Sequence, residues 1–68
     1  MKTKYKSLIA EVMADKGVSV RALAEKTGLS KDTIQRAKSD ISGSSFGTME
    51  KIAEALGVRV SDLYEEQM

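Results

Sequence analysis

Apolar side chains in the first quarter of the chain recur at the spacing of an amphipathic helix. The residues at i, i+3, i+4, i+7 and i+8 are Tyr5, Leu8, Ile9, Val12 and Met13. Because one face of an α-helix carries this spacing, we predict a helix over about residues 3–16. Gly17 followed by Val18 predicts its end, since glycine adopts the left-handed conformation without steric cost and the next apolar residue folds back on the last turn.

The same pairing of glycine with an apolar residue occurs twice more, at Gly28-Leu29 and at Gly57-Val58. We therefore expect three helices to end in Schellman-type caps. The spacings between the three glycines have no common period, so the pattern predicts no repeat architecture.

Other helices are predicted where a serine or threonine precedes an apolar periodic segment. Such a side chain accepts a hydrogen bond from an N–H of the first turn. On this basis a second helix follows Ser19 to about Lys26, a third follows Ser30 to about Ser39, a fourth follows Thr48, and a short fifth follows Ser61. The residues expected to face inward are Val20, Leu23, Ala24, Ile34, Ala37, Met49, Ile52, Ala53, Leu56, Val60, Leu63 and Tyr64. Since the chain contains no proline, these segments favour an all-α fold.

Between the third and fourth helices lies the only linker-like stretch, residues 40–47, which is rich in serine and glycine. A connection this polar needs an apolar anchor. We expect Phe46 to supply it by packing into the core.

Length and composition restrict what the chain can do. Its 68 residues are enough for one small domain, and 41% apolar with 31% charged residues is the balance of a soluble globular protein. Histidine and cysteine are absent, which removes the commonest general base, the usual zinc ligands and any thiolate nucleophile. We therefore expect no enzyme, no catalytic residue, no metal or cofactor and no small-molecule substrate.

The only apolar run behind the basic start is three residues long, which predicts no signal peptide, no membrane association and a cytoplasmic protein.

Charge is distributed unevenly along the chain. Residues 1–48 contain nine Lys or Arg against five Asp or Glu, whereas residues 49–68 contain two against five. A basic front and an acidic back suit a protein that presents one face to a polyanion. Two ordinary solvated surfaces explain the charge pattern equally well.

The most informative segment is VRALAEKTGLSKDTIQRAKS, residues 20–39. Two short helices meet there at Thr27-Gly28-Leu29, and so short a turn predicts a steep crossing. Ala24 is small where the helix backbones approach, Gly28 supplies a positive φ, and Leu29 with Ile34 fills the angle between the helices.

The spacing of Leu23-Ala24, Gly28-Leu29, Ile34 and Ala37 resembles the helix-turn-helix of the phage repressor and Cro-like (Cro/C1-type, lambda-repressor-like) DNA-binding family. The downstream run MEKIAEALGV, followed by Ser61-Asp62-Leu63, is similar to that family's fourth and fifth helices. The resemblance implies a compact five-helix domain over residues 1–68 that binds double-stranded operator DNA. It also implies a homodimer on a palindromic site and a role as a small transcriptional repressor or related regulator.

The resemblance makes residues 30–39 the recognition helix, which enters the major groove. A helical wheel places Asp32, Gln35 and Arg36 opposite the apolar side, with Lys31 at the edge. These four are the candidate base contacts. Lys31 or Arg36 suits the acceptors of guanine and Gln35 suits adenine, whereas Asp32 either accepts from cytosine or orients Arg36.

We expect the remaining candidates to contact the DNA backbone, which fixes a protein's position on the duplex without reading its sequence. Ser30 caps the recognition helix where a phosphate approaches, and Thr33 suits a phosphate or a thymine methyl group. The expected phosphate contacts are Ser30, Thr33, Arg21, Lys26, Lys38, Ser42, Gly43 and Ser44.

Five positions depart from the pattern of the family. Val20 replaces a glutamine that contacts phosphate, and Met13 with Lys38 replaces a buried Arg–Glu ion pair. Asp40 stands where a glycine often closes the recognition helix, and Ser44 replaces a frequent proline. Loop conformation is therefore the least transferable feature.

Several alternatives stay open. The chain is also compatible with the antitoxin of a toxin–antitoxin pair, or with a helical interaction module that does not bind DNA. The four candidate base contacts also fit an ordinary solvated helix face, and Lys2, Lys4 and Lys6 fit either an arm that reaches DNA or a solvated terminus. A dimer surface is suggested by Val60, Leu63, Tyr64 and Met68.

Overall fold

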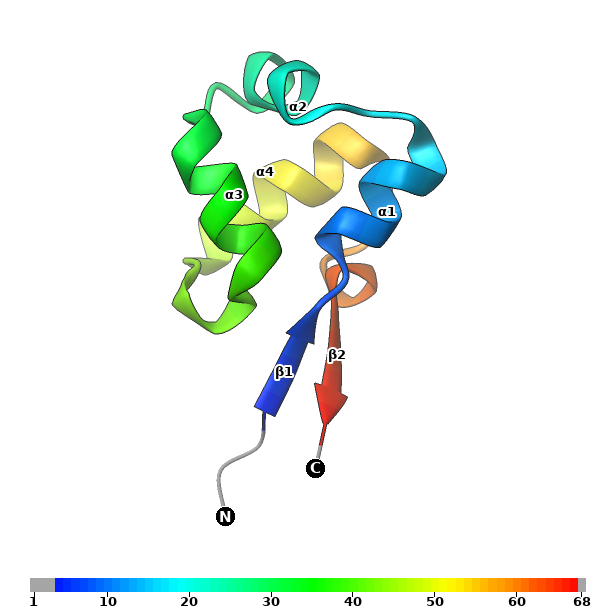
Figure 1. Cartoon of the computed structure of the whole chain (residues 1–68), viewed down its shortest axis with the longest axis vertical. Coiled ribbons are helices and arrows are strands. Elements are labelled where there is room, and N and C mark those ends of the chain that lie inside the picture. The colour runs from blue at the N-terminus through cyan, green and yellow to red at the C-terminus, as the bar shows by residue number, and fades with distance from the viewer. Residues whose placement is uncertain (1–3, 68) are drawn as a thin grey trace.

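The computed structural model describes residues 4–67 and contains four α-helices, two short 3-10 helices and two short strands (Figure 1). In chain order these are β1 (Lys4–Ser7), α1 (Ile9–Lys16), α2 (Val20–Thr27), α3 (Lys31–Ser39), η1 (Ile41–Gly43), α4 (Phe46–Leu56), η2 (Val60–Leu63) and β2 (Tyr64–Gln67). The helices form the body of the molecule, and the strands project from one end of it (Figure 1).

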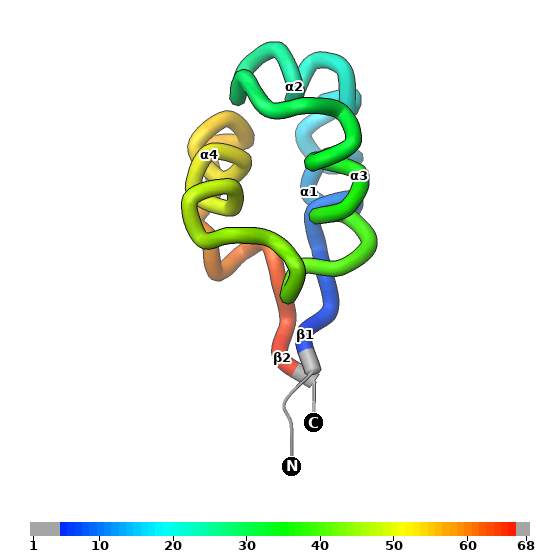
Figure 2. Tube along the Cα trace, turned by 90° about the vertical axis from the view of Figure 1, so that its left-hand side faces the viewer, coloured from blue at the N-terminus to red at the C-terminus, as the bar shows by residue number. Residues whose placement is uncertain are grey.

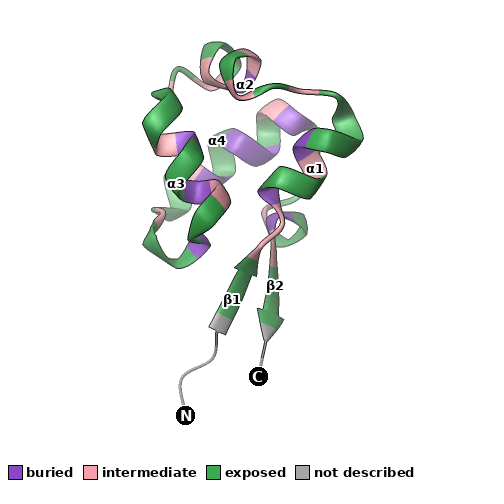
Figure 3. Ribbon diagram, viewed as in Figure 1, coloured by how far each residue is buried: buried purple, intermediate pink, exposed green. Residues whose placement is uncertain are grey.

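The helices enclose one hydrophobic core. In the view of Figure 2, α3 and α4 lie on opposite sides, and α2 lies across the end remote from the strands. The buried residues are Ile9, Met13, Leu23, Ile34, Ala37, Ile41, Met49, Ile52, Ala53, Leu56 and Leu63. Among residues 5–66, whose burial the structure describes, none of the buried residues is polar or charged, so the core depends on apolar packing. Figure 3 shows the buried residues on the inner sides of the helices.

The prediction of a helix from residue 3 is wrong at its start. Residue 3 lies outside the described part, α1 begins only at Ile9, and Lys4–Ser7 forms β1. β1 pairs antiparallel with β2, so that Lys6 lies opposite Glu65, and an opposite-charge pair across two strands is favourable. Tyr5, which was expected on the buried stripe of the helix, is 45% exposed. Its ring packs edge-to-face on Tyr64 at 5.5 Å between centroids.

The end of the chain also differs from the prediction, because its last residues form the strand that pairs with β1. The expected fifth α-helix is the 3-10 helix η2, which begins at Val60 and gives way to β2 after one turn. The Leu8 N–H donates to the Leu63 carbonyl at 2.8 Å, which joins the start of α1 to the end of η2. A five-helix, all-α fold is therefore corrected to four α-helices closed by a two-stranded sheet.

Phe46 is not the core anchor that the sequence suggested. Its side chain is 66% exposed, and Ile41 of η1 is buried in its place. The cause is the start of α4, which is capped by Ser45 rather than Thr48. Phe46 is therefore the first residue of the helix, one turn before Met49, where the core begins.

Glycines end α1, α2 and α4 as predicted, with φ values of 67°, 76° and 71° at Gly17, Gly28 and Gly57. Two of the caps show the Schellman bond. The Val18 N–H donates to the Met13 carbonyl at 2.9 Å, and the Val58 N–H donates to Ala53 at 3.0 Å. At Gly28 the cap is different: the glycine N–H donates to the Ala24 carbonyl at 2.9 Å, but the Leu29 N–H does not donate to a helix carbonyl.

The positive φ of Gly28 gives a testable prediction. A Cβ built there meets no atom within 4 Å, so the Gly28→Ala variant suffers backbone strain alone. We expect it to lower the free energy of unfolding by about 1–2 kcal/mol, measured by urea denaturation. The matched control is Gly47→Ala within α4, where a Cβ also meets open space and φ is not in the left-handed region. That variant should be neutral or stabilising by up to about 1 kcal/mol; equal destabilisation of both variants would contradict the explanation.

Candidate nucleic-acid interface

The turn between α2 and α3 is held by Thr27, a residue that the sequence analysis did not single out. Its Oγ1 donates to the Leu23 carbonyl at 2.7 Å and accepts the Leu29 N–H at 3.1 Å. The Thr27 side chain thus accepts the Leu29 N–H, which in a Schellman cap would donate to a helix carbonyl. The sequence pattern Thr-Gly-Leu, in which a threonine directly precedes the glycine that ends the helix, could have indicated this role of Thr27. The chain leaves this turn with α3 at a steep angle to α2 (Figure 1).

One side of α3 is fixed to the body of the protein. Ile34 and Ala37 are fully buried. In addition, the Ser7 hydroxyl of β1 donates to the Ala37 carbonyl at 2.8 Å. These contacts determine which side of α3 faces solvent.

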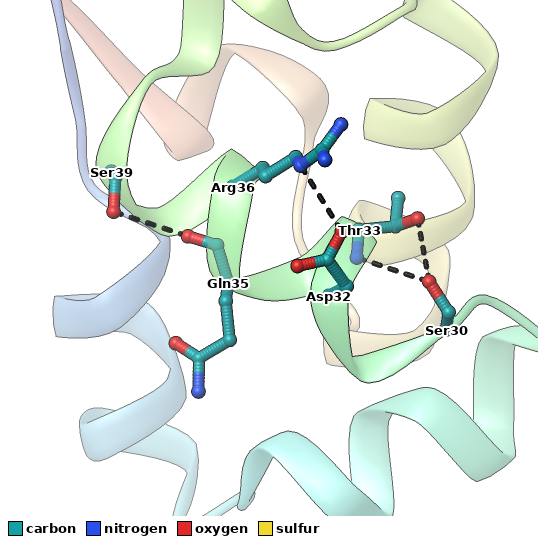
Figure 4. A network of polar contacts seen from close by, with 6 residues as sticks. All are labelled: Ser30, Asp32, Thr33, Gln35, Arg36 and Ser39. Atoms are coloured by element: carbon teal, nitrogen blue, oxygen red, sulfur yellow. Dashed lines mark hydrogen bonds and ion pairs between the residues drawn. The ribbon is translucent and has the colours of Figure 1, made fainter.

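The outer side of α3 carries the four candidate base contacts. Lys31, Asp32, Gln35 and Arg36 are all exposed, and much of α3 has the colour of exposed residues in Figure 3. The Arg36 Nε lies 3.1 Å from an Asp32 carboxylate oxygen, with the two side chains 81% and 74% exposed. In Figure 4 Arg36 reaches over Asp32, while Gln35 leaves the helix in another direction.

The start of α3 is capped as predicted by Ser30. Its Oγ accepts the Thr33 N–H at 3.1 Å, and the two hydroxyls lie 2.8 Å apart (Figure 4). Ser45 and Thr48 repeat this arrangement at the start of α4, with distances of 3.1 and 2.9 Å. The spacing Ser-x-x-Thr therefore marks both helix starts, and it would have located the start of α4 correctly.

The three cationic candidates for phosphate contacts differ in their surroundings. The Arg21 Nε lies 3.7 Å from Glu25 on the exposed side of α2, where Lys26 is also exposed. Lys38, near the end of α3, is half-buried. Together these three residues place cations on both helices of the pair.

The loop after α3 is folded on itself. The N–H groups of Ser42, Gly43 and Ser44 donate respectively to the Asp40 carboxylate at 3.1 Å, the Asp40 carbonyl at 3.3 Å and the Ile41 carbonyl at 3.1 Å. The Ser42 hydroxyl also donates to Asp40, at 2.6 Å. The donors expected to bind phosphate therefore already have acceptors within the loop.

Two departures from the family pattern now have a structural account. Asp40 caps η1 with an extended φ of −144°, so no left-handed residue is needed at the end of α3. Met13 is part of the apolar core, and an arginine there would need a buried partner, because an unpaired buried charge is strongly destabilising.

Sites for other chemistry were searched for within residues 4–67. No three or more of the Asp and Glu residues in that range come together as candidate metal ligands. None of the helices in the same range is both long enough and apolar enough to cross a membrane.

Comparison with known proteins agrees with the arrangement of α2 and α3. The family model of the Cro/C1-type HTH DNA-binding domain matches residues 9–67. No curated protein matches the chain. Since the family model covers most of the chain, from the start of α1 to the end of β2, the protein belongs to the Cro/C1-type helix-turn-helix DNA-binding family.

Proposed function

We propose that residues 1–68 act as one DNA-binding domain of a transcriptional regulator, a repressor of the phage or prophage type, and not as an enzyme. The observation that carries the proposal is the division of α3 into a buried side, with Ile34 and Ala37, and an exposed polar side, with Lys31 and Arg36. A helix anchored on one side and polar on the other can enter the major groove without rearrangement.

In this proposal Lys31, Asp32, Gln35 and Arg36 lie against base edges, and the backbone contacts come from the flanking residues. Arg21, Lys26 and Lys38 neutralise phosphates, and Ser30 and Thr33 lie where the start of α3 meets the backbone. Contacts from Ser42, Gly43 and Ser44 require that the bonds of the loop be exchanged for bonds to phosphate. We therefore expect the cations to contribute more than the loop.

The first test is selection of bound sequences from random duplex DNA, followed by measurement of affinity at several salt concentrations. We expect an enriched sequence and a dissociation constant that rises steeply with salt, because each neutralised phosphate contributes about 0.9 to the slope of log K against log salt. A helical interaction module without DNA binding would enrich no sequence. An antitoxin would bind DNA and also co-purify with a partner protein.

Arg36→Ala tests the assignment of the recognition helix. Its side chain is 81% exposed, so the substitution leaves the fold intact. We expect a loss of about 1–3 kcal/mol in binding to the selected duplex and a relaxed preference at one base position. An equal loss on every sequence would instead make Arg36 a phosphate contact.

The proposed DNA complex is a homodimer on a palindromic operator, with half-sites about 34 Å apart. The dimer surface differs from the sequence-based expectation, because Leu63 is fully buried and Met68 lies outside the described residues. We propose instead that the dimer surface includes an apolar groove of about 310 Å³, which is lined mainly by Tyr5, Ile41, Phe46, Met49, Val60 and Tyr64. Phe46 is one of these lining residues and is 66% exposed. An exposed ring in the lining of an apolar groove suits a two-fold interface, in which each copy presents the same patch to the other.

Phe46→Ser tests this dimer. Because the side chain is mostly exposed, we expect the free energy of unfolding to change by less than about 0.5 kcal/mol. Sedimentation equilibrium should show weaker self-association, and affinity for a palindromic duplex should fall with it. The control is Glu54→Ser, on α4 and away from the groove. A wild-type protein that is monomeric both alone and on a palindromic duplex would rule out the dimer.

A further inference from the structure

Asp32 is the one acidic residue among the four candidate base contacts on the exposed side of α3. A carboxylate that approaches DNA is repelled by the phosphates, so its presence there requires a compensating interaction. Its only ion pair within residues 4–67 is with Arg36, one turn further along the helix, at 3.1 Å from Nε (Figure 4).

The atom that forms this pair matters for recognition. A guanidinium group carries five N–H donors in one plane. When Asp32 engages Nε, the edge formed by the two Nη groups stays available for a second partner. That edge carries parallel donors, which match the O6 and N7 acceptors of guanine in the major groove.

We propose that Asp32 is a positioning residue, which holds Arg36 by Nε so that its Nη edge meets a guanine of the operator. The inference rests on the proposed function and adds a base and a mechanism to it.

The ion pair gains importance when the helix enters the groove. In the free protein both side chains are mostly exposed, so water and salt screen the pair and the fold gains little from it. In the groove, water is displaced and the attraction strengthens, while a carboxylate without Arg36 would be left unpaired beside the DNA. The two residues should therefore be coupled in DNA binding far more than in folding.

Two other roles for Asp32 make different predictions. As the second residue of α3, its charge also favours the positive end of the helix dipole. That role affects stability and leaves base preference unchanged. If Asp32 instead accepted from a cytosine amino group, its loss would alter a preference that Arg36→Ala leaves intact.

The experiment compares Asp32→Ala, Asp32→Asn, Arg36→Ala and the double variant with Asp32 and Arg36 both changed to alanine. Each is measured on the selected duplex and on a duplex with the guanine of the Arg36-sensitive position replaced by adenine, at one salt concentration. We expect both Asp32 variants to reduce the preference for guanine roughly threefold to tenfold, and the double variant to lose no more preference than Arg36→Ala alone. Asp32→Glu, which keeps a carboxylate at i,i+4, should restore part of the preference.

Glu25→Ala is the matched control. It removes the other exposed i,i+4 pair, in which Arg21 Nε and Glu25 lie 3.7 Å apart with side chains 80% and 73% exposed. Any effect of this control on affinity should be the same for both duplexes. Thermal unfolding of every variant separates loss of fold from loss of preference.

The outcomes distinguish the two proposals. If the wild-type protein prefers no sequence, the proposed function fails and this inference fails with it. If the wild type prefers a sequence and Arg36→Ala relaxes one position, but both Asp32 variants keep the full preference for guanine there, only the positioning role is overturned. Additive losses in the double variant would overturn it as well.

Discussion

Ile34 and Ala37 are completely excluded from solvent, and their packing fixes which side of α3 faces water. Once Ile34 and Ala37 are buried, the polar side chains on the opposite side of α3 must face solvent. Thr27 and Gly28 act on the same contact from the preceding turn, since they set the direction in which the chain leaves α2. The candidate interface therefore follows from apolar burial on the opposite side of the helix, and its own polar groups need contribute little to the fold.

Local chemistry explains which features could be predicted from the sequence. The serine caps of α2 and α3, the glycine stops and the buried periodic residues depend on neighbours within a few positions along the chain. β1 depends instead on a partner 57 to 63 residues away along the chain. The spacing from Tyr5 to Leu8 is that of a helix, so no local pattern indicates the strand. The exposure of Phe46 was missed because a cap at Ser45, in place of Thr48, moves the ring outside the core. Asp32 and Arg36 were identified as a possible pair, but only coordinates show which nitrogen is engaged.

The loop after α3 shows how one substitution changes what a neighbouring segment offers. Asp40 supplies a carboxylate that accepts both the N–H and the hydroxyl of Ser42. A glycine in place of Asp40 would accept neither bond, and the Ser42 N–H would then be available to an external acceptor such as a phosphate. Asp40 also brings negative charge to a segment that the resemblance places beside phosphates. In the proposed complex, phosphate binding at this loop would begin from donors that already have acceptors and from a locally acidic segment. The cations of α2 and α3 would then be more important for holding the DNA backbone.

The small net charge of the chain is an argument for the proposed dimer. The chain has a formal net charge of only +1, so attraction to DNA depends on where its cations lie rather than on how many there are. Arg21, Lys26 and Lys38 give one copy three candidate phosphate contacts, and non-specific binding grows with the number of phosphates neutralised. A second copy doubles those contacts, and once the first half-site is occupied the second binds at high effective concentration. For a domain with so small a net charge, the spacing that the proposed dimer would fix is therefore as important to affinity as the proposed recognition helix itself.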